Sequence, residues 1–270
     1  MAGPLNCAGV ASDPKGGGQP ALSGMACPPS EPDQKSWRFV DDRDRTLDAH
    51  GQMEADLGLL DEVARGAPPA LRLYRWAPPA LSLGRFQADD EVDVAACRRL
   101  GVEVVRRPTG GRAILHGGDL TYAVALPKPP GGAGAVDAVY RMLAGALIAG
   151  LARVGVDAAV ARSDGSPGPA CFAGQAGSDL RVGDRKLCGS AQVYRGGAVL
   201  QHGALLLERL DFDETDVLHA IDGRPLDRAQ LRAATVTLAE LGAPADAGVI
   251  GDALVAGFVE IFDLRFTSRV

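Results

Sequence analysis

The chain has 270 residues, of which 46% are apolar and 23% charged, and its formal net charge is −6 at pH 7. These values are typical of a globular protein with a sizeable core, and they exclude the overall basic charge that nucleic-acid binding usually leaves in a sequence. The five cysteines include no C-x-x-C pair and follow no secretory leader, which argues against a disulfide scaffold and a zinc ribbon. No apolar run approaches the ~18 residues of a membrane span, so the sequence predicts a cytoplasmic protein without a membrane segment.

Residues 1–36 differ in composition from the rest of the chain. They are rich in Gly, Pro, Ala and Ser and hold few large apolar side chains. Burial of so little apolar surface cannot offset the entropy that a chain loses when it becomes ordered. We therefore expect a disordered N-terminal extension over 1–36 and one folded domain over 37–270, which opens with Trp37.

The first half of the domain predicts a long helix, a short helix and several strands. The long helix covers 46–66 and stops at Gly66, a common C-terminal signal, and the short helix covers 92–100. One face of the long helix is formed by residues at spacings of three and four, namely His50, Met53, Leu57, Leu60 and Ala64. Short strands are expected at 70–76, 80–86, 102–107, 112–116 and 120–126.

The second half predicts two further long helices and a set of hairpins. The helices cover 135–154 and about 250–261, where apolar residues recur with the helical period. The stretch 179–208 reads as strands joined by glycine turns at 183–184 and 196–197. Because strands and helices do not alternate strictly, we expect an α+β fold with mixed or antiparallel sheets packed with helices.

The stretch RRPTGGRAILH offers candidate binding residues. Gly110 and Gly111 form either an ordinary hairpin turn, for which glycine is the usual residue, or a bare loop against which a ligand lies. Arg106 and Arg107 precede them, either as a solvated face or as cations for a carboxyl or carbonyl group. His116 ends the next strand and is either a core histidine or part of the same binding site.

Cys171 is the candidate nucleophile, because it lies in a Pro-rich loop rather than on an apolar helical face. Most isolated cysteines are inert packing residues. However, Lys186 follows a hairpin turn, so its strand can pair back toward this loop, and an ammonium near a thiol favours the nucleophilic thiolate. Otherwise Lys186 is an exposed strand lysine. Cys188 is expected on the same strand face as Lys186, and we interpret it as a packing residue beside Leu187.

Four stretches occur in the order WAPPALSLGRFQ, RRPTGGRAILHGGDLTYAV, PACF and DRKLCGSAQVYRGGAVLQHG. Together they resemble the catalytic fold of the lipoate and biotin protein ligases, and within that superfamily the cysteine-bearing octanoyltransferases that begin protein lipoylation. The resemblance covers about residues 37–265, which implies that 37–270 is a catalytic domain of this type.

The resemblance implies a two-step reaction. A cysteine takes octanoyl from octanoyl-acyl carrier protein as a thioester and passes it to a lysine of a lipoyl domain, such as the glycine-cleavage H protein or an E2 subunit of a 2-oxoacid dehydrogenase. It identifies Cys171 as the nucleophile and Lys186 as the group that favours its thiolate. No metal and no other cofactor is implied. The acyl pocket would consist of Arg107, Thr109, Gly110, Gly111 and His116, with Gly189 and Ser190 beside it.

Two positions depart from the pattern of ATP-using lipoate ligases. Arg112 stands where those ligases have a third glycine, and Gly117 where they have an aspartate after the histidine. Those ligases also usually carry an accessory C-terminal domain, which we do not expect here. The differences favour acyl transfer over adenylation. They leave open a transferase that uses octanoylated H protein as its donor, an ATP-dependent lipoate ligase and a non-catalytic lipoyl-domain binding module.

Overall fold

The computed structural model describes residues 35–131, 134–161, 179–220 and 225–269. These lie in the larger of two units, residues 32–270, and are described by themselves. The strands are β1 (Ser36–Asp42), β2 (Ala70–Tyr74), β3 (Ala80–Leu83), β4 (Glu103–Arg106), β5 (Ile114–His116), β6 (Asp119–Pro127), β7 (Ala159–Val160), β8 (Leu180–Val182), β9 (Arg185–Arg195), β10 (Ala198–Leu206) and β11 (Arg265–Arg269).

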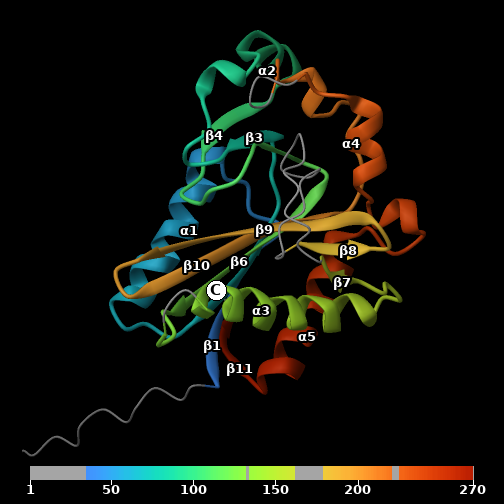
Figure 1. The fold of residues 1–270 in the computed structure, drawn as a ribbon. Helices are drawn as coiled ribbons and strands as arrows, with labels where there is room; N and C mark the ends of the chain where they lie inside the picture. The colour runs from blue at the N-terminus through green and yellow to red at the C-terminus, as the bar shows by residue number, and fades with distance from the viewer. Residues whose placement is uncertain (1–34, 132–133, 162–178, 221–224, 270) are drawn as a thin grey trace, which may run out of the picture. The chain divides into compact units, whose positions relative to one another are not determined.

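Two sheets organise these strands (Figure 1). The larger sheet has the order β11-β1-β2-β6-β10-β9-β8-β7, and the smaller has the order β4-β3-β5. The pairs β1–β11, β1–β2 and β3–β4 are parallel, and the remaining pairs are antiparallel. The mixed sheets confirm the predicted α+β class.

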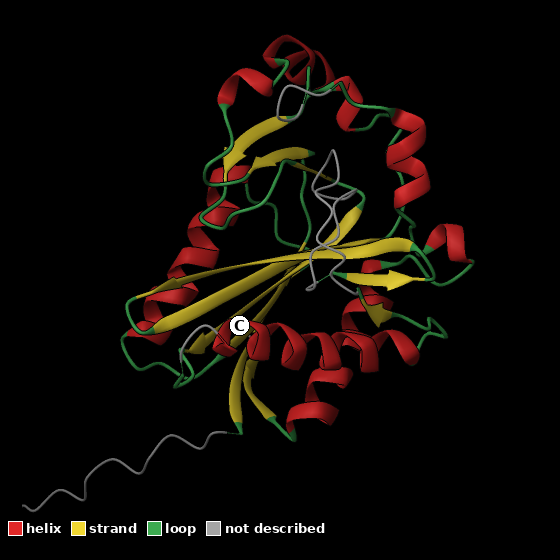
Figure 2. Ribbon diagram, viewed as in Figure 1, coloured by secondary structure: helices red, strands yellow, loops and turns green. Residues whose placement is uncertain are grey.

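Helices cover both faces of the larger sheet (Figure 2). The helices are α1 (Ala49–Ala64), α2 (Val94–Leu100), α3 (Gly134–Ala152), α4 (Arg228–Ala234) and α5 (Ala247–Phe262), with short 3₁₀ turns η1 (Asp89–Glu91), η2 (Glu214–Asp216) and η3 (Ala239–Leu241). One face of the sheet packs against α3 and α5, and the opposite face packs against α1 and the smaller sheet. The sheet therefore lies between two apolar layers.

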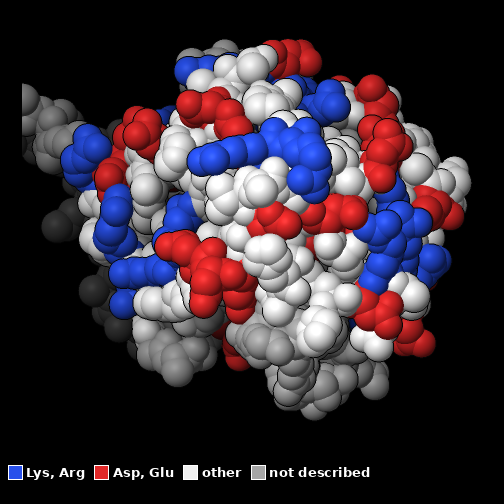
Figure 3. Space-filling view, turned by 90° about the horizontal axis from the view of Figure 1, so that it is seen from above, with Lys and Arg blue, Asp and Glu red and all other residues white. Residues whose placement is uncertain are grey.

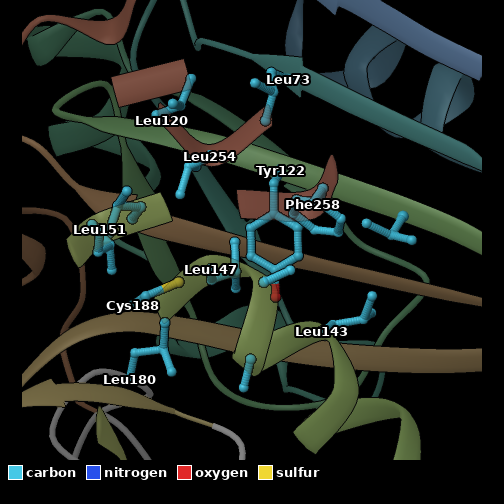
Figure 4. Packing of buried hydrophobic residues seen from close by; sticks show 14 of the residues in the cluster. Leu73, Leu120, Tyr122, Leu143, Leu147, Leu151, Leu180, Cys188, Leu254 and Phe258 are labelled. Carbon is cyan, nitrogen blue, oxygen red and sulfur yellow. The ribbon is translucent and has the colours of Figure 1, made fainter. Parts of the chain in front are cut away.

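The core under α3 and α5 is the larger of these layers (Figure 4). Leucines of the two helices meet the ring of Tyr122 and the side chains of alternate strand residues. The helices approach closely at Gly257, where a β-carbon would lie 2.3 Å from the carbonyl oxygen of Ala146. A larger side chain at this crossing would push the helices apart.

The predicted elements are found, and Met53, Leu57, Leu60 and Ala64 of the predicted α1 face pack inward, but two residues of this helix differ from the expectation. His50 is exposed, whereas Asp56 is fully buried. The cause is Arg72 on β2, whose guanidinium is 1% exposed and bonds to Asp56 at 2.9 Å and Asp42 at 2.7 Å. A buried guanidinium is stable only when its charge is paired, and Asp56 on the inward side of α1 provides the carboxylate.

Charged side chains of both signs are interspersed on the face shown in Figure 3. Ion pairs among the described residues include Arg228 with Asp213 at 2.9 Å and with Asp216 at 2.6 Å. Among the described helices, none is long and apolar enough to cross a membrane.

Candidate active site

The glycine pair lies in the connection between β4 and β5, and Arg107 holds this connection in place. Arg107 is 3% exposed. Its Nη1 donates to the carbonyl of Ser82 at 2.8 Å, and its Nη2 donates to the carbonyls of Gly110 at 2.8 Å and Arg112 at 2.6 Å. A guanidinium that bonds three backbone carbonyls fixes the path of the loop. Contact between Arg107 and a substrate stays a prediction.

The two glycines of this loop have different roles. Gly111 has φ +93°, a left-handed conformation that favours glycine, and its carbonyl packs against Gly84 so tightly that a β-carbon on Gly84 would lie 1.8 Å away. Gly110 differs, since no atom of the described residues other than its chain neighbours lies within 4 Å of where its β-carbon would be. The loop thus needs Gly111 for its backbone, whereas Gly110 leaves open space beside it.

Thr109 connects this loop to the larger sheet through a buried chain of hydrogen bonds. Its hydroxyl lies 2.7 Å from His202 Nε2, and His202 Nδ1 lies 2.9 Å from Asp56 Oδ2. Asp56 in turn accepts from Tyr74 at 3.0 Å and from Arg72. All five side chains are buried. The chain ties the loop to α1, β2 and β10.

His116 belongs to a second buried chain. Its Nε2 lies 2.9 Å from the Ser82 hydroxyl and its Nδ1 lies 3.0 Å from Asp119 Oδ2, while its ring stacks on Trp76 with centroids 4.2 Å apart. Burial opposes the charge of Asp119, but His116 and the Thr121 hydroxyl hold its pKa below the ordinary value. His116 is thus buried and held through both ring nitrogens, as a core histidine would be, and its contact with a substrate stays a prediction.

Both chains have the order hydroxyl, imidazole, carboxylate that defines catalytic triads. Their hydroxyls are not available for attack on a substrate, because Thr109 and Ser82 are each 1% exposed. We therefore assign the two chains to the positioning of the glycine loop.

Lys186 lies on β9 and is buried rather than exposed. Its ammonium is 2.9 Å from Asp179 Oδ2, and the two residues are 5% and 2% exposed. A β-bulge lies beside it, because Leu180 pairs with Cys188 while the next residue, Arg181, pairs with Lys186. The interpretation of Lys186 as an exposed strand lysine is therefore wrong.

The bulge also corrects the expected face of Cys188. Leu187 is the extra residue, and both Leu187 and Cys188 pack into the core under α3 and α5 (Figure 4). Lys186 consequently points to the opposite face. Burial, with Asp179 nearby, raises the pKa of the Cys188 thiol to about 12. Such a thiol stays protonated at neutral pH, which agrees with a packing role.

Gly189 and Ser190 follow the bulge and lie on opposite faces of the sheet. Ser190 lies across from Gly203, and its hydroxyl is 2.7 Å from the Tyr122 hydroxyl in the core. A β-carbon on Gly203 would lie 2.6 Å from the Tyr122 ring, so glycine is needed there for this contact. The side chain of Ser190 is therefore turned away from the face that carries Lys186, and only its backbone is left for a binding role.

Strand register and the bulge bring two of the predicted residues, Gly189 and Lys186, to one surface with His202. His202 pairs with Ala123 and Ala191, and two residues further along the strands Ala204 pairs with Thr121 and Gly189. Paired residues share a face of a sheet. We call the face that carries His202, Gly189 and Lys186 the site face. The glycine loop attaches to it through the bond between Thr109 and His202.

Cys171, the predicted nucleophile, lies outside the described residues, so its position relative to Lys186 stays a prediction. Sequence reasoning did not identify His202, Asp56, Asp119, Ser82 or Asp179, which orient the loop and the lysine. Ser82, Asp119 and His202 had a signal, since they stand in stretches that carry the family resemblance, whereas Asp56 and Asp179 stand outside those stretches. Among the described residues, no group of three or more His, Cys, Asp or Glu could hold a metal ion.

Comparison with known proteins identifies the family. A model of the lipoyl protein ligase A/B catalytic domain matches residues 48–244. Among curated relatives, octanoyltransferase LipM of Symbiobacterium thermophilum is 39% identical over 252 residues, which is 87% of this chain and 89% of that protein. Octanoyltransferase LipM of Kyrpidia tusciae is 38% identical over 231 residues, or 79% and 83% of the two chains.

Solved structures show the same fold. Lipoate-protein ligase A bound with ATP superposes with a TM-score of 0.69 at 24% identity, covering 87% of this chain and 88% of the other. The bipartite lipoate protein ligase of Thermoplasma acidophilum gives a TM-score of 0.65 at 24% identity, with 87% of both chains covered. The architecture is that of a lipoate-protein ligase. The chain belongs to the lipoyl protein ligase A/B catalytic domain family, and its close sequence relatives are octanoyltransferases, which supports an acyltransferase acting in protein lipoylation.

Proposed function

We propose that this protein transfers octanoyl from octanoyl-acyl carrier protein to a lysine of a lipoyl domain, through a thioester on Cys171. The observation that carries the proposal is the 39% identity to an octanoyltransferase over 87% of the chain. The burial of Lys186 beside Asp179, on the face to which the glycine loop attaches, supports it. A cytoplasmic location and the absence of a metal cofactor stay predictions.

The proposed chemistry consists of two acyl transfers. The Cys171 thiolate attacks the carbonyl of the donor thioester, the bond from that carbonyl to the donor sulfur breaks, and the donor leaves as a thiol after it takes up a proton. The ε-amine of the acceptor lysine then attacks the enzyme thioester, loses a proton and releases the Cys171 thiol. The product is an amide. The Lys186 ammonium would stabilise the thiolate and the negative oxygen that develops on the carbonyl.

The glycine loop would hold the acyl chain. Apolar contact contributes about 0.8 kcal/mol for each buried CH₂, so an octanoyl chain supplies substantial affinity without a nucleotide. Gly110 offers space beside its backbone, and Arg107, Thr109 and His116 keep the loop in one conformation. In this proposal these residues act mainly through the shape of the pocket.

A transfer assay tests the proposal. Purified protein is incubated with octanoyl-acyl carrier protein and a lipoyl domain without ATP, and the mass of the lipoyl domain is followed. We expect an octanoyl amide on the lipoyl domain. Modification that requires ATP and free octanoate or lipoate would instead identify a ligase, and modification only from octanoylated H protein would identify the other donor.

Two cysteine variants give a matched control. Cys171→Ala should abolish transfer, whereas Cys188→Ala should keep most of it, because the Cys188 thiol is buried in the core. Loss of transfer in Cys188→Ala with full activity in Cys171→Ala would show that the nucleophile is assigned to the wrong cysteine. If no donor supports transfer, the remaining candidate function is a non-catalytic module that binds lipoyl domains.

A further inference from the structure

Three structural features converge on the position of Lys186. The bulge at Leu187 turns Lys186 to the site face. The backbone of Lys186 also bonds to the segment after α4, since Val236 N donates to the Lys186 carbonyl at 2.9 Å. The third feature is the ion pair with Asp179. Together they fix both the backbone and the charged end of this side chain.

The direction of Asp179 follows from the strand that begins beside it. Leu180 is 1% exposed and packs in the core with Cys188, with which it pairs. Because neighbouring residues of an extended strand alternate in direction, Asp179 points to the opposite face. This is the face to which the bulge turns Lys186. The ion pair therefore forms on the site face, at the edge where β8 meets β9.

A buried ammonium is stable only when it is paired, because removal of its water shell is costly. Lys186 is 5% exposed, so the carboxylate of Asp179 offsets that cost. Without the carboxylate, the charged end of the lysine would turn toward solvent, and this would remove a positive charge from the site face.

We propose that Asp179 is a positioning residue, which holds the charged end of Lys186 on the site face for the acyl transfer. The inference rests on the proposed function, because it assumes that Lys186 assists the reacting thiol and carbonyl. Asp179 itself touches neither the acyl group nor the thiol in this proposal. It acts through Lys186.

Asp179→Asn tests the proposal, because it keeps the shape of the side chain and removes its charge. The rate of acyl-enzyme formation from octanoyl-acyl carrier protein is measured by intact-protein mass. We expect a loss of about 10- to 100-fold, the effect of displacing a reacting group by about an ångström. Asp179→Glu, which keeps the carboxylate, should recover part of the rate. An unchanged rate in Asp179→Asn would overturn the proposal.

A double-mutant cycle separates positioning from a general structural effect. If Asp179 acts through Lys186, Asp179→Asn should slow the reaction by less than about threefold when Lys186→Met is already present. The adduct accumulates, so slow rates are still measurable over long incubations. An equal loss in both backgrounds would show that Asp179 acts independently of Lys186.

A control variant and a labelling experiment complete the test. Asp41→Asn removes a carboxylate of β1 that accepts a hydrogen bond from Arg43 at 2.7 Å. Because β1 lies four strands away from β9 in the sheet, this variant should leave the rate unchanged. An equal loss of rate in Asp41→Asn would overturn the proposal.

Acetic anhydride should label Lys186 faster in Asp179→Asn than in the wild type, while the exposed Lys128 is labelled equally in both. Equal labelling of Lys186 would overturn the positioning role. If the wild type forms no adduct but the labelling differs, the proposed function fails and the positional inference stands.

Discussion

At the residue scale, the glycine loop shows how one short motif serves two needs. Gly111 and Gly84 are required by the backbone, because one has a left-handed conformation and the other lies against the Gly111 carbonyl. Gly110 has no such constraint. From the sequence, the pair reads either as a hairpin turn or as a binding loop. The two interpretations separate only when the neighbours of each glycine are known.

Alanine substitutions should distinguish these roles. Gly84→Ala places a β-carbon 1.8 Å from a carbonyl oxygen, so we expect a loss of about 1–3 kcal/mol in the free energy of unfolding, measured with urea. Gly110→Ala should change stability by less than about 0.5 kcal/mol and raise the KM for the octanoyl donor. An unchanged KM would show that the acyl chain lies elsewhere.

At the element scale, local patterns predict most of the helices and strands. The hairpin turns at Gly183 and Gly196 have positive φ angles, as glycine there suggests. The strands β1 and β11 pair with each other across more than 200 residues of sequence, and such pairing has no local signal. The bulge at Leu187 is equally hidden, because it depends on how β8 aligns with β9. This one extra residue determines the face of the sheet to which the Lys186 side chain points.

The inward face of α1 offers a stability test at this scale. Asp56→Ala leaves Arg72 buried with one acidic partner fewer, so we expect a loss of about 3–5 kcal/mol in urea unfolding. His50 is on the exposed side of the same helix. His50→Ala should change stability by less than about 0.5 kcal/mol. The opposite ranking would place His50, rather than Asp56, on the packed side of the helix.

At the scale of the whole molecule, the fold is shared by proteins with different chemistry, so the fold alone does not define the reaction. The two solved structures compared above are lipoate protein ligases, whereas the two curated relatives, which have higher sequence identity, are octanoyltransferases. The motifs predicted the superfamily and the class of the sheets. They did not reveal the buried chains around His202 and His116, because those contacts join residues from separate parts of the sequence.

The N-terminal segment gives a prediction for the complete chain. Residues 1–34 contain few apolar residues that could pack. Their deletion should leave both the turnover number and the melting temperature nearly unchanged, since segments that make few contacts contribute little to stability. Differential scanning fluorimetry and the transfer assay measure both quantities. A fall of many degrees would show that the segment packs against the domain.

The central claim is that a cysteine thioester carries the acyl group, and one measurement tests it most directly. The protein is incubated with octanoyl-acyl carrier protein in the absence of any lipoyl domain, and its intact mass is recorded before and after treatment with hydroxylamine, with peptide mapping of the adduct. The account predicts one octanoyl group on Cys171, which hydroxylamine removes because it is a thioester. A protein that transfers octanoyl to a lipoyl domain without ever carrying an adduct, or that carries it on another residue, would contradict the account.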